Sequence, residues 1–128
     1  MQNKDKINTP GTDYTNAAKP GTVVALGMFD GMHVGHKKII DATVLIARQS
    51  GLVPAVFTFK NHPQELFGKK VLRLCSNETR AALMRRQGIE LVDEVEFTSA
   101  IRDLSAESFI RMLAERLNPK IIVAGFNY

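Results

Sequence analysis

The segment Thr22–His36, TVVALGMFDGMHVGH, decides the fold. It opens with Val23–Leu26, a short apolar run with β-branched residues that stops at a glycine, which predicts a buried β-strand. Over Val34–Ser50 the apolar residues recur at helical spacing, and Gly51 then supplies a helix stop. The face of this helix that we expect to be buried carries Ile40, Val44 and Ala47. A strand, a glycine-rich turn and a helix are therefore predicted in direct succession.

The same alternation of strand and helix continues along the chain. The further predicted elements are a strand over Val53–Phe59, a helix capped by Ser76 and ending near Gln87, a strand nearer the sheet edge over Leu91–Phe97, a helix capped by Ser105 and ended by Asn118-Pro119, and a buried strand over Ile121–Ala124. The core face of the last helix carries Phe109, Leu113 and Leu117. This order predicts an α/β fold, a Rossmann-like parallel sheet flanked by helices on both faces.

The chain divides into a tail and one domain. Residues 1–20 are polar and can bury too little apolar surface to offset the entropy of ordering, so we expect a flexible tail. Residues 21–128 are enough for one domain with a core. The sequence stops a few residues after the last predicted strand, although ligands in this architecture bind at the carboxyl ends of strands. We therefore expect the domain to be incomplete at its C-terminal end.

The composition is that of a globular protein in a reducing compartment. Hydrophobic residues make up 45% and charged residues 23% of the 128 residues. No apolar run approaches the length of a membrane span, and the N-terminus lacks the apolar middle of a secretory signal. Cys75 is the only cysteine and cannot form an internal disulfide, so a cytoplasmic location is expected. The net charge of +4 suits anionic ligands but alone does not distinguish nucleotides from nucleic acid.

The turn between the first strand and the first helix carries the chemistry. Its glycines, Gly27, Gly31 and Gly35, allow a tight turn and close approach of a ligand to the backbone. The free amides of the following helix N-terminus favour an anion. His33 and His36 are three residues apart and could both reach oxygens of one polyphosphate.

Other interpretations of the two histidines stay open at this point. A histidine at a helix start is most often a surface or capping residue. Two histidines could also form half of a zinc site, but a catalytic zinc normally has three protein ligands and the only other histidine is His62. The glycines fit neither the Walker A pattern nor the G-x-G-x-x-G pattern of dinucleotide-binding proteins.

The motif F-D-G-x-H-x-G-H resembles the signature of the nucleotidyltransferase superfamily. The rest of the chain resembles one member, the FMN adenylyltransferase module of bacterial bifunctional riboflavin kinase/FAD synthetases. The similar segments are Thr58-Phe59-Lys60-Asn61-His62-Pro63 (T-F-x-P-H-P in the family), Phe97-Thr98 followed by Leu104–Phe109 (F-T…L-S-x-E-x-F), and Val123–Tyr128 (the start of V-G-x-[DN]-[FY]-x-F-G). They occur in the family's order and spacing from about Gly21 onward.

Three features depart from the family pattern. Asn61 stands where the family usually has proline, in the loop expected to meet the flavin. Lys37 replaces the glutamine that commonly follows the second histidine. The later I-S-S-T-x-I-R segment, implicated in holding the ATP phosphates, lies beyond Tyr128, and no riboflavin kinase domain is present in these residues.

The resemblance implies transfer of AMP from MgATP to FMN, giving FAD and pyrophosphate. It assigns catalysis to His33, His36 and Asn127, ATP binding to Gly27, Phe29, Asp30, Gly31, His33, Gly35, His36 and Asn127, and flavin binding to Phe59, Asn61, His62, Pro63 and Phe67. Asn127 is also the candidate contact for Mg²⁺. Asp30 would serve equally well as a turn-forming residue, and Phe59 as plain strand core.

Two other functions remain open from the residues alone. One is a related nucleotidyltransferase with a different phosphorylated acceptor, such as nicotinamide mononucleotide, pantetheine phosphate or glycerol phosphate. The other is a truncated, inactive nucleotide-binding fragment. The segment Phe57–Pro63 favours FMN, whereas the early end of the chain favours a fragment. Neither nucleic acid nor a membrane is an expected partner.

Overall fold

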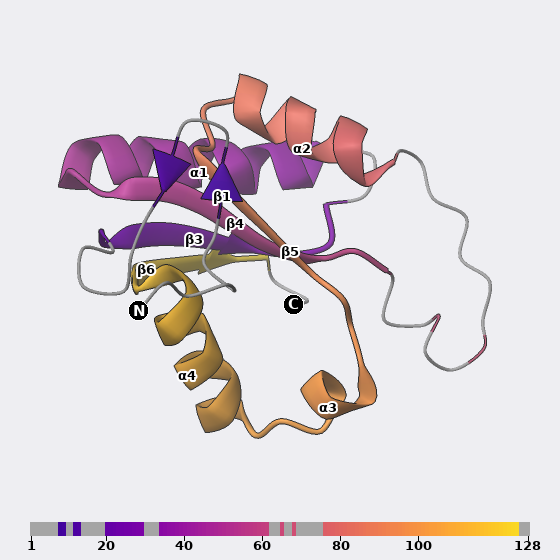
Figure 1. Cartoon of the computed structure of the whole chain (residues 1–128). Coiled ribbons are helices and arrows are strands. Elements are labelled where there is room, and N and C mark those ends of the chain that lie inside the picture. Colours follow the sequence, from indigo (N-terminus) through magenta and orange to yellow (C-terminus); the bar gives the residue numbers. More distant parts are fainter. Residues whose placement is uncertain are drawn as a thin grey trace.

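A computed structural model of the chain describes residues 8–9, 12–13, 20–29, 34–61, 65, 68 and 76–125. Its centre is a four-stranded sheet in the order β5-β4-β3-β6, in which every neighbouring pair is parallel (Figure 1). The strands are β3 (Thr22–Leu26), β4 (Val53–Phe59), β5 (Leu91–Val95) and β6 (Pro119–Ala124). The helices are α1 (Val34–Ser50), α2 (Asn77–Arg86), α3 (Ser99–Arg102) and α4 (Ala106–Leu117). The predicted α/β fold is confirmed.

Helices α1 and α2 cover one face of the sheet, and α4 covers the other (Figure 1). Side chains on a strand alternate between faces, so each central strand feeds two cores. Ala25 of β3 and Val56 of β4 pack with α1 and α2, and the other residues of this core are Phe29, Ile40, Val44, Met84 and Ile89. Burial on both faces explains why β3 and β4 read as nearly continuous apolar runs.

The second core lies between the sheet and α4. It consists of Val24, Leu26, Ala55, Phe57, Phe59, Leu91, Leu113 and Leu117, with Phe97, Ile101 and Phe109 packed against it. Leu113 and Leu117 are buried as predicted, whereas Phe109 is only half-buried. The assignment of Phe109 to the core is therefore correct only in part, because it packs against the core but part of its surface remains exposed.

The predicted helix boundaries are confirmed at their caps. The Ser76 hydroxyl accepts a hydrogen bond from the Thr79 amide (3.1 Å), and Ser105 does the same for Ser108 (3.1 Å). α4 ends at Asn118, whose φ of 48° lies in the left-handed region that asparagine tolerates. Gly51, with φ of 68°, follows α1 in the same way.

Three elements differ from the sequence-based expectation. β5 ends at Val95 rather than at Phe97, and the short helix α3 follows it after a cap by Thr98, whose hydroxyl accepts from the Ile101 amide. β6 is an edge strand on β3 and is not buried: Ile121 and Ile122 are 37% and 39% exposed. An apolar run alone does not show whether a second neighbouring strand or a helix covers it.

The N-terminal region contains regular structure that the composition did not predict. β1 (Asn8–Thr9) and β2 (Thr12–Asp13) form a short antiparallel ladder, and β1 comes close to β5. The ladder is local, so it depends on backbone pairing and little on the apolar residues that this region lacks. Flexibility of the rest of residues 1–20 stays a prediction. Among the helices that the structure describes, none is long and apolar enough to cross a membrane.

Candidate functional site

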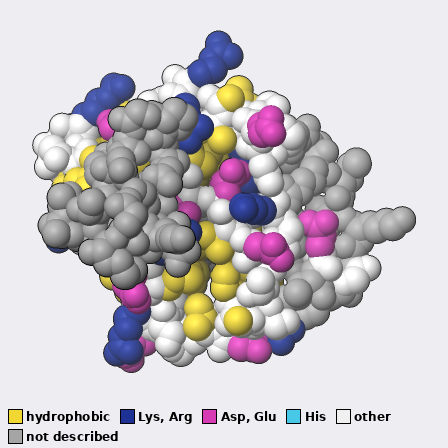
Figure 2. All heavy atoms as spheres, viewed as in Figure 1, with side chains coloured by type: hydrophobic (Ala, Val, Ile, Leu, Met, Phe, Trp, Pro, Cys, Tyr) yellow, Lys and Arg dark blue, Asp and Glu magenta, His cyan; other side chains and the backbone are white. Residues whose placement is uncertain are grey.

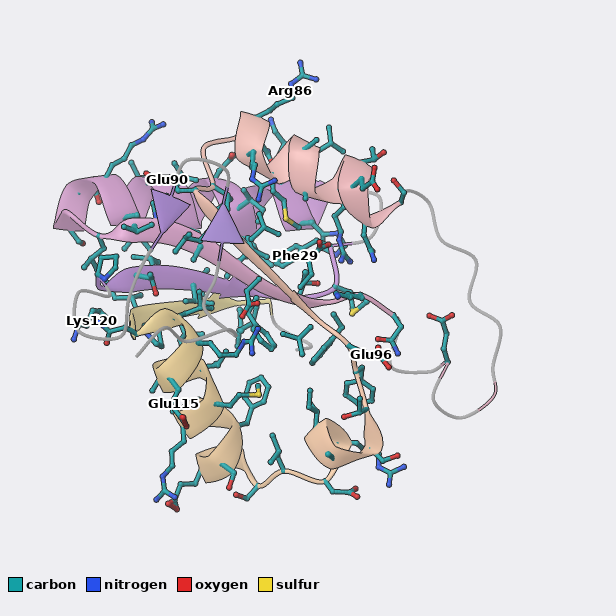
Figure 3. The ribbon with its side chains drawn as sticks, viewed as in Figure 1. Phe29, Arg86, Glu90, Glu96, Glu115 and Lys120 are labelled. Carbon is teal, nitrogen blue, oxygen red and sulfur yellow. The ribbon has the colours of Figure 1, made fainter. Side chains whose placement is uncertain are left out.

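In the segment just after β3, at the carboxyl edge of the sheet, the Phe29 side chain packs against the backbone of Gly27. Phe29 has a φ of 54°, and its ring is fully buried between the sheet and the layer of α1 and α2 (Figure 3). A Cβ atom on Gly27 would lie 2.8 Å from Cζ of this ring. Glycine is therefore required at position 27, because the ring occupies the space that any side chain would need. From the sequence we expected a ligand to approach the backbone at Gly27; in the structure the Phe29 ring fills the space beside it.

His36 lies in the first turn of α1, next to this ring. Its imidazole meets Phe29 edge to face, with ring centroids 5.5 Å apart and an interplanar angle of 79°. His36 is half-buried, so this contact limits the directions its ring can take. Of the residues predicted to bind ATP, the structure thus brings Gly27, Phe29 and His36 together at one end of β3.

The end of β6 reaches the same helix. A Cβ atom on Gly125, the residue after β6, would lie 3.1 Å from Cδ1 of Ile39. Ile39 is three residues after His36, so the backbone leaving β6 passes beside the beginning of α1. A larger residue at position 125 would therefore have to displace the end of the Ile39 side chain by a few tenths of an ångström.

On the other side of the edge, aromatic side chains form an open pocket of about 360 Å³. The rings of Phe59 and Phe97 meet edge to face with centroids 5.0 Å apart, and Phe109 packs against Phe57 at 5.8 Å. The pocket is lined by Phe59, Phe97, Ile101, Arg102, Leu104, Ser105, Ala106 and Phe109. Figure 2 shows hydrophobic side chains reaching the surface between α4 and α3, with charged side chains around them.

Asn61 positions one wall of this pocket. Its amide nitrogen donates to the Phe97 carbonyl (3.1 Å), and its amide oxygen accepts from the Phe97 amide (2.7 Å). The sequence predicted Asn61 as a flavin-binding residue, but the structure occupies both polar atoms with backbone. Phe97 and Phe109 are pocket residues that sequence reasoning missed as binding residues, although their aromatic character in the F-T…L-S-x-E-x-F segment was a usable signal.

Two arginines at this edge are paired with carboxylates. Arg102, at the pocket rim, bonds Asp103 (2.9 and 3.3 Å), and the hydrogen bonds from its guanidinium lower the pKa of the Asp103 carboxyl. Arg80 of α2 is buried and bonds Glu94 of β5. Arg80 was also missed, although its spacing of four from Met84 placed it on the buried side of its helix.

Several predicted site residues lie outside the described part of the chain. They are Asp30, Gly31, His33, His62, Pro63, Phe67 and Asn127. Gly35 is described only as part of the backbone of α1. Their assigned roles stay predictions. Among the described residues, no three His, Cys, Asp or Glu side chains gather in a way that could hold a metal ion.

The parallel sheet, the glycine turn into α1 and the pocket at the carboxyl edge define an α/β domain of the nucleotidyltransferase type. Residues 15–128 match the sequence model of the family described as FAD synthetase. This chain belongs to that family.

Curated relatives agree with this assignment. The bifunctional riboflavin kinase/FMN adenylyltransferases of Listeria monocytogenes and Bacillus subtilis are 38% and 36% identical over 83% and 84% of this chain. A protein named FAD synthetase from L. monocytogenes is 27% identical over 88% of it. The chain spans 35% of the length of each bifunctional relative and 48% of the third.

A solved structure has the same fold. It is a crystal structure described as a macrolide-efflux protein from Streptococcus pneumoniae, with a TM-score of 0.80 and 30% identity. The likeness covers 100% of this chain and 40% of that one.

Proposed function

We propose that this domain carries out the FMN adenylyltransferase reaction, transfer of AMP from ATP to FMN. Family membership supports the reaction, and one observation carries its placement: the glycine turn and the aromatic pocket adjoin at one sheet edge. The Thr58 hydroxyl donates to the Met28 carbonyl (3.4 Å), and Met28 packs against the core that contains Phe59. A polyphosphate on the turn and a flat ring in the pocket would therefore be close neighbours.

In the reaction, a phosphate oxygen of FMN forms a bond to the α-phosphorus of ATP. The bond from that phosphorus to the oxygen bridging to the β-phosphate breaks, and pyrophosphate leaves with the bonding electrons. The FMN phosphate is already an anion at neutral pH, so no side chain has to remove a proton. The protein has to hold two anions in line and stabilise the charge that develops between them.

For this task we assign His33 and His36 to the ATP phosphates. The Phe29 ring against His36 supports the assignment, because a histidine held on one side presents its donors in a fixed direction. Gly27, Gly31 and Gly35 give backbone access, with Phe29 and Asp30 shaping the turn. Asn127 follows Gly125, whose closeness to Ile39 supports a place for this amide near the beginning of α1.

We propose Mg²⁺ as a partner of the substrate phosphates. The described residues offer no cluster of protein ligands for it, and Mg²⁺ commonly keeps water and phosphate oxygens as most of its ligands. Asn127 is the protein contact that we propose. When bound, the ion would neutralise phosphate charge.

For the flavin we propose Phe59, His62, Pro63 and Phe67, and we add Phe97 and Phe109 from the pocket. An aromatic and aliphatic lining suits the isoalloxazine ring. Asn61 acts by holding Phe97 rather than by contacting the ring through its amide. We place the reaction in the cytoplasm, where a chain with one cysteine needs no oxidising environment, and nucleic acid has no part in it.

The test is product formation from ATP labelled at the α-phosphate. Incubation with FMN and Mg²⁺ should give labelled FAD and one pyrophosphate per FAD, separated by chromatography. Parallel reactions replace FMN with nicotinamide mononucleotide, pantetheine phosphate or glycerol phosphate. A labelled product from one of these acceptors but not from FMN would contradict the proposal, and so would the absence of any labelled product.

A further inference from the structure

Arg80 is the largest fully buried side chain among the described residues, with 2% of its surface exposed. Burial of a charged group is unfavourable unless it is paired and hydrogen-bonded. The helix that carries it is fixed at its start, because Ser76 caps α2 and the Arg80 amide donates to the Ser76 carbonyl (2.9 Å). The hydrogen-bond partners of Arg80 must therefore explain why this charged side chain is buried.

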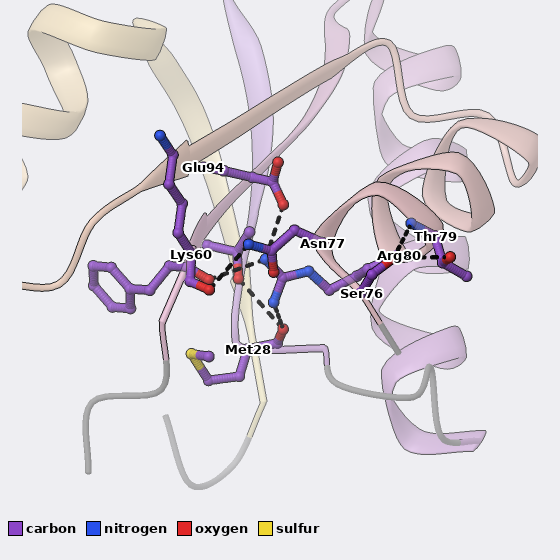
Figure 4. A network of polar contacts seen from close by, with 9 residues as sticks. Met28, Lys60, Ser76, Asn77, Thr79, Arg80 and Glu94 are labelled. Carbon is purple, nitrogen blue, oxygen red and sulfur yellow. Dashed lines mark hydrogen bonds and ion pairs between the residues drawn. The ribbon is translucent and has the colours of Figure 1, made fainter. Parts of the chain in front are cut away.

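The guanidinium of Arg80 bonds two strands and the segment just after a third, at the carboxyl edge of the sheet (Figure 4). Nη1 donates to the carbonyl of Met28, just after β3, at 2.7 Å. Nη2 donates to the carbonyl of Phe59, the last residue of β4, at 3.0 Å. Nη2 also lies 2.9 Å from Oε2 of Glu94 in β5.

A second side chain from the first turn of α2, that of Asn77, also holds the end of β4. The Asn77 amide donates to the Lys60 carbonyl at 3.0 Å, one residue beyond the Arg80 contact on Phe59. The first turn of α2 thus holds the end of β4 at two successive carbonyls.

The two carbonyls that Arg80 holds belong to the two halves of the proposed site. Met28 lies between Gly27 and Phe29 on the phosphate side, and Phe59 lines the aromatic pocket. One planar guanidinium with fixed donor directions sets the spacing between them. Met28 and Arg80 are 52 residues apart, so no local geometry imposes this spacing.

Arg116 of α4 provides an internal comparison. It bonds Asp93 of β5 through two parallel hydrogen bonds (2.7 and 2.8 Å), and Asp93 is 6% exposed. Asp93 and Glu94 are successive residues of one strand and point to opposite faces. Arg116 therefore ties α4 to β5 through an ion pair with Asp93, on the opposite face of the strand from Glu94.

We propose that Arg80 is a positioning residue for the adenylyl transfer. It holds the phosphate turn and the flavin pocket at the separation that brings the two substrates in line. This inference rests on the proposed function for its kinetic consequence. Its structural consequence, restraint of Met28 and Phe59 by one side chain, can be measured without any substrate.

The kinetic test compares Arg80→Lys, Arg80→Met and Arg116→Met in the full-length protein. A small misplacement of reacting groups lowers turnover by about 10²-fold, so we expect kcat to fall about a hundredfold in R80M. We expect a fall of about tenfold in R80K, because lysine keeps the positive charge but lacks the planar set of donors of the guanidinium. KM for ATP and for FMN should change less than kcat. R116M should keep its kcat within about twofold even where its Tm falls.

The second measurement is hydrogen exchange of the backbone amides of residues 27–29 and 59–61, taken relative to those of α1. We expect these amides to exchange about tenfold faster in R80M and to be unchanged in R116M. If R80M does not fold, R80K carries both measurements. If the wild-type protein makes no FAD, the proposed function fails and the exchange data alone decide the role of Arg80.

The proposal is overturned by a folded R80M or R80K variant with kcat within twofold of wild type. It is equally overturned if R116M loses as much turnover as R80M, since the effect would then be one of general stability. Unchanged exchange at residues 27–29 and 59–61 in a folded Arg80 variant also overturns it.

Discussion

Asn61 and Phe97 share two hydrogen bonds: the side-chain nitrogen of Asn61 donates to the Phe97 C=O at 3.1 Å, and its side-chain oxygen accepts from the Phe97 N–H at 2.7 Å. The pattern resembles two residues paired in a β-ladder, except that the side-chain amide of Asn61 takes the place of a backbone amide. The last ladder contact before it is the Lys60 amide on the Val95 carbonyl (2.9 Å). Asn61 therefore continues the attachment of β4 to the chain beyond β5, where Phe97 forms a wall of the aromatic pocket.

Asn61→Ala should loosen this wall. Both polar groups of Phe97 would lose their partner, which costs about 1–3 kcal/mol for each buried group left unsatisfied and less at this half-buried position. We expect weaker FMN binding, by about tenfold, with ATP binding changed little. Titration of flavin fluorescence measures the first and calorimetry with an ATP analogue the second.

The matched variant is Asn61→Asp, which can accept from the Phe97 amide but cannot donate to its carbonyl. It should fall between wild type and Asn61→Ala in FMN affinity. Equal FMN affinity in all three proteins would show that the Phe97 contact does not organise the pocket.

Gly27→Ala should disturb the phosphate turn through the Phe29 ring. The new methyl group would lie 2.8 Å from Cζ of a fully buried ring that cannot swing into solvent. Overpacking of this kind costs about 1–3 kcal/mol, and here the strain is adjacent to the predicted ATP phosphates. We expect a lower midpoint in urea unfolding together with a loss of ATP affinity.

Gly51→Ala is the control for Gly27→Ala. Gly51 has a φ of 68° and open space around it, so alanine there costs about 1–2 kcal/mol of backbone strain at the far end of α1. It should lower stability and leave ATP affinity unchanged. If Gly27→Ala has wild-type ATP affinity, the turn at Gly27 is not part of the ATP-binding site.

His36→Phe separates packing from chemistry at the start of α1. A phenyl ring can keep the edge-to-face contact with Phe29, so stability should change by about 1 kcal/mol or less. It has no hydrogen-bond donor, and loss of one transition-state donor lowers kcat by about 10²- to 10³-fold. FAD formation and thermal unfolding of the same preparation measure both effects.

Lys38→Ala, at an exposed position two residues further on, should keep full activity and stability. Wild-type turnover in His36→Phe would rule out phosphate stabilisation by His36. Loss of folding in the same variant would show that the imidazole has a structural role that a phenyl ring cannot fill.

Sequence patterns predicted those elements whose signals are local. The caps at Ser76 and Ser105 and the helix end at Asn118 depend on neighbouring residues, and all three are confirmed. The sequence predicted the strand β6 but not its exposure, because burial depends on which elements lie beside a strand. A continuous apolar run looks the same at the centre and at the edge of a sheet.

The candidate site shows the same division. The glycine turn and His36 were assigned to the site from a motif that is contiguous in the sequence. Arg80 was not, because its acceptors Met28 and Phe59 come from other strands and are backbone carbonyls, which any sequence supplies. Asn61 was noticed as a departure from the family pattern, yet its partner Phe97 is 36 residues away and no local rule connects them.

Phe109 and Leu113 lie one turn apart on α4 and allow binding to be separated from core packing. Leu113 is fully buried, whereas Phe109 is half-buried and lines the pocket beside Phe59. Leu113→Ala should cost about 2–5 kcal/mol of stability and leave FMN affinity intact in the folded protein. Phe109→Ala should cost less stability, because part of the ring is accessible already, but should weaken FMN binding by about tenfold through loss of ring contact. Fluorescence titration with FMN, together with urea unfolding of each variant, measures the two effects. If Leu113→Ala weakens FMN binding as much as Phe109→Ala does, the pocket owes its affinity to general packing of α4, and the aromatic lining would lose its assigned role.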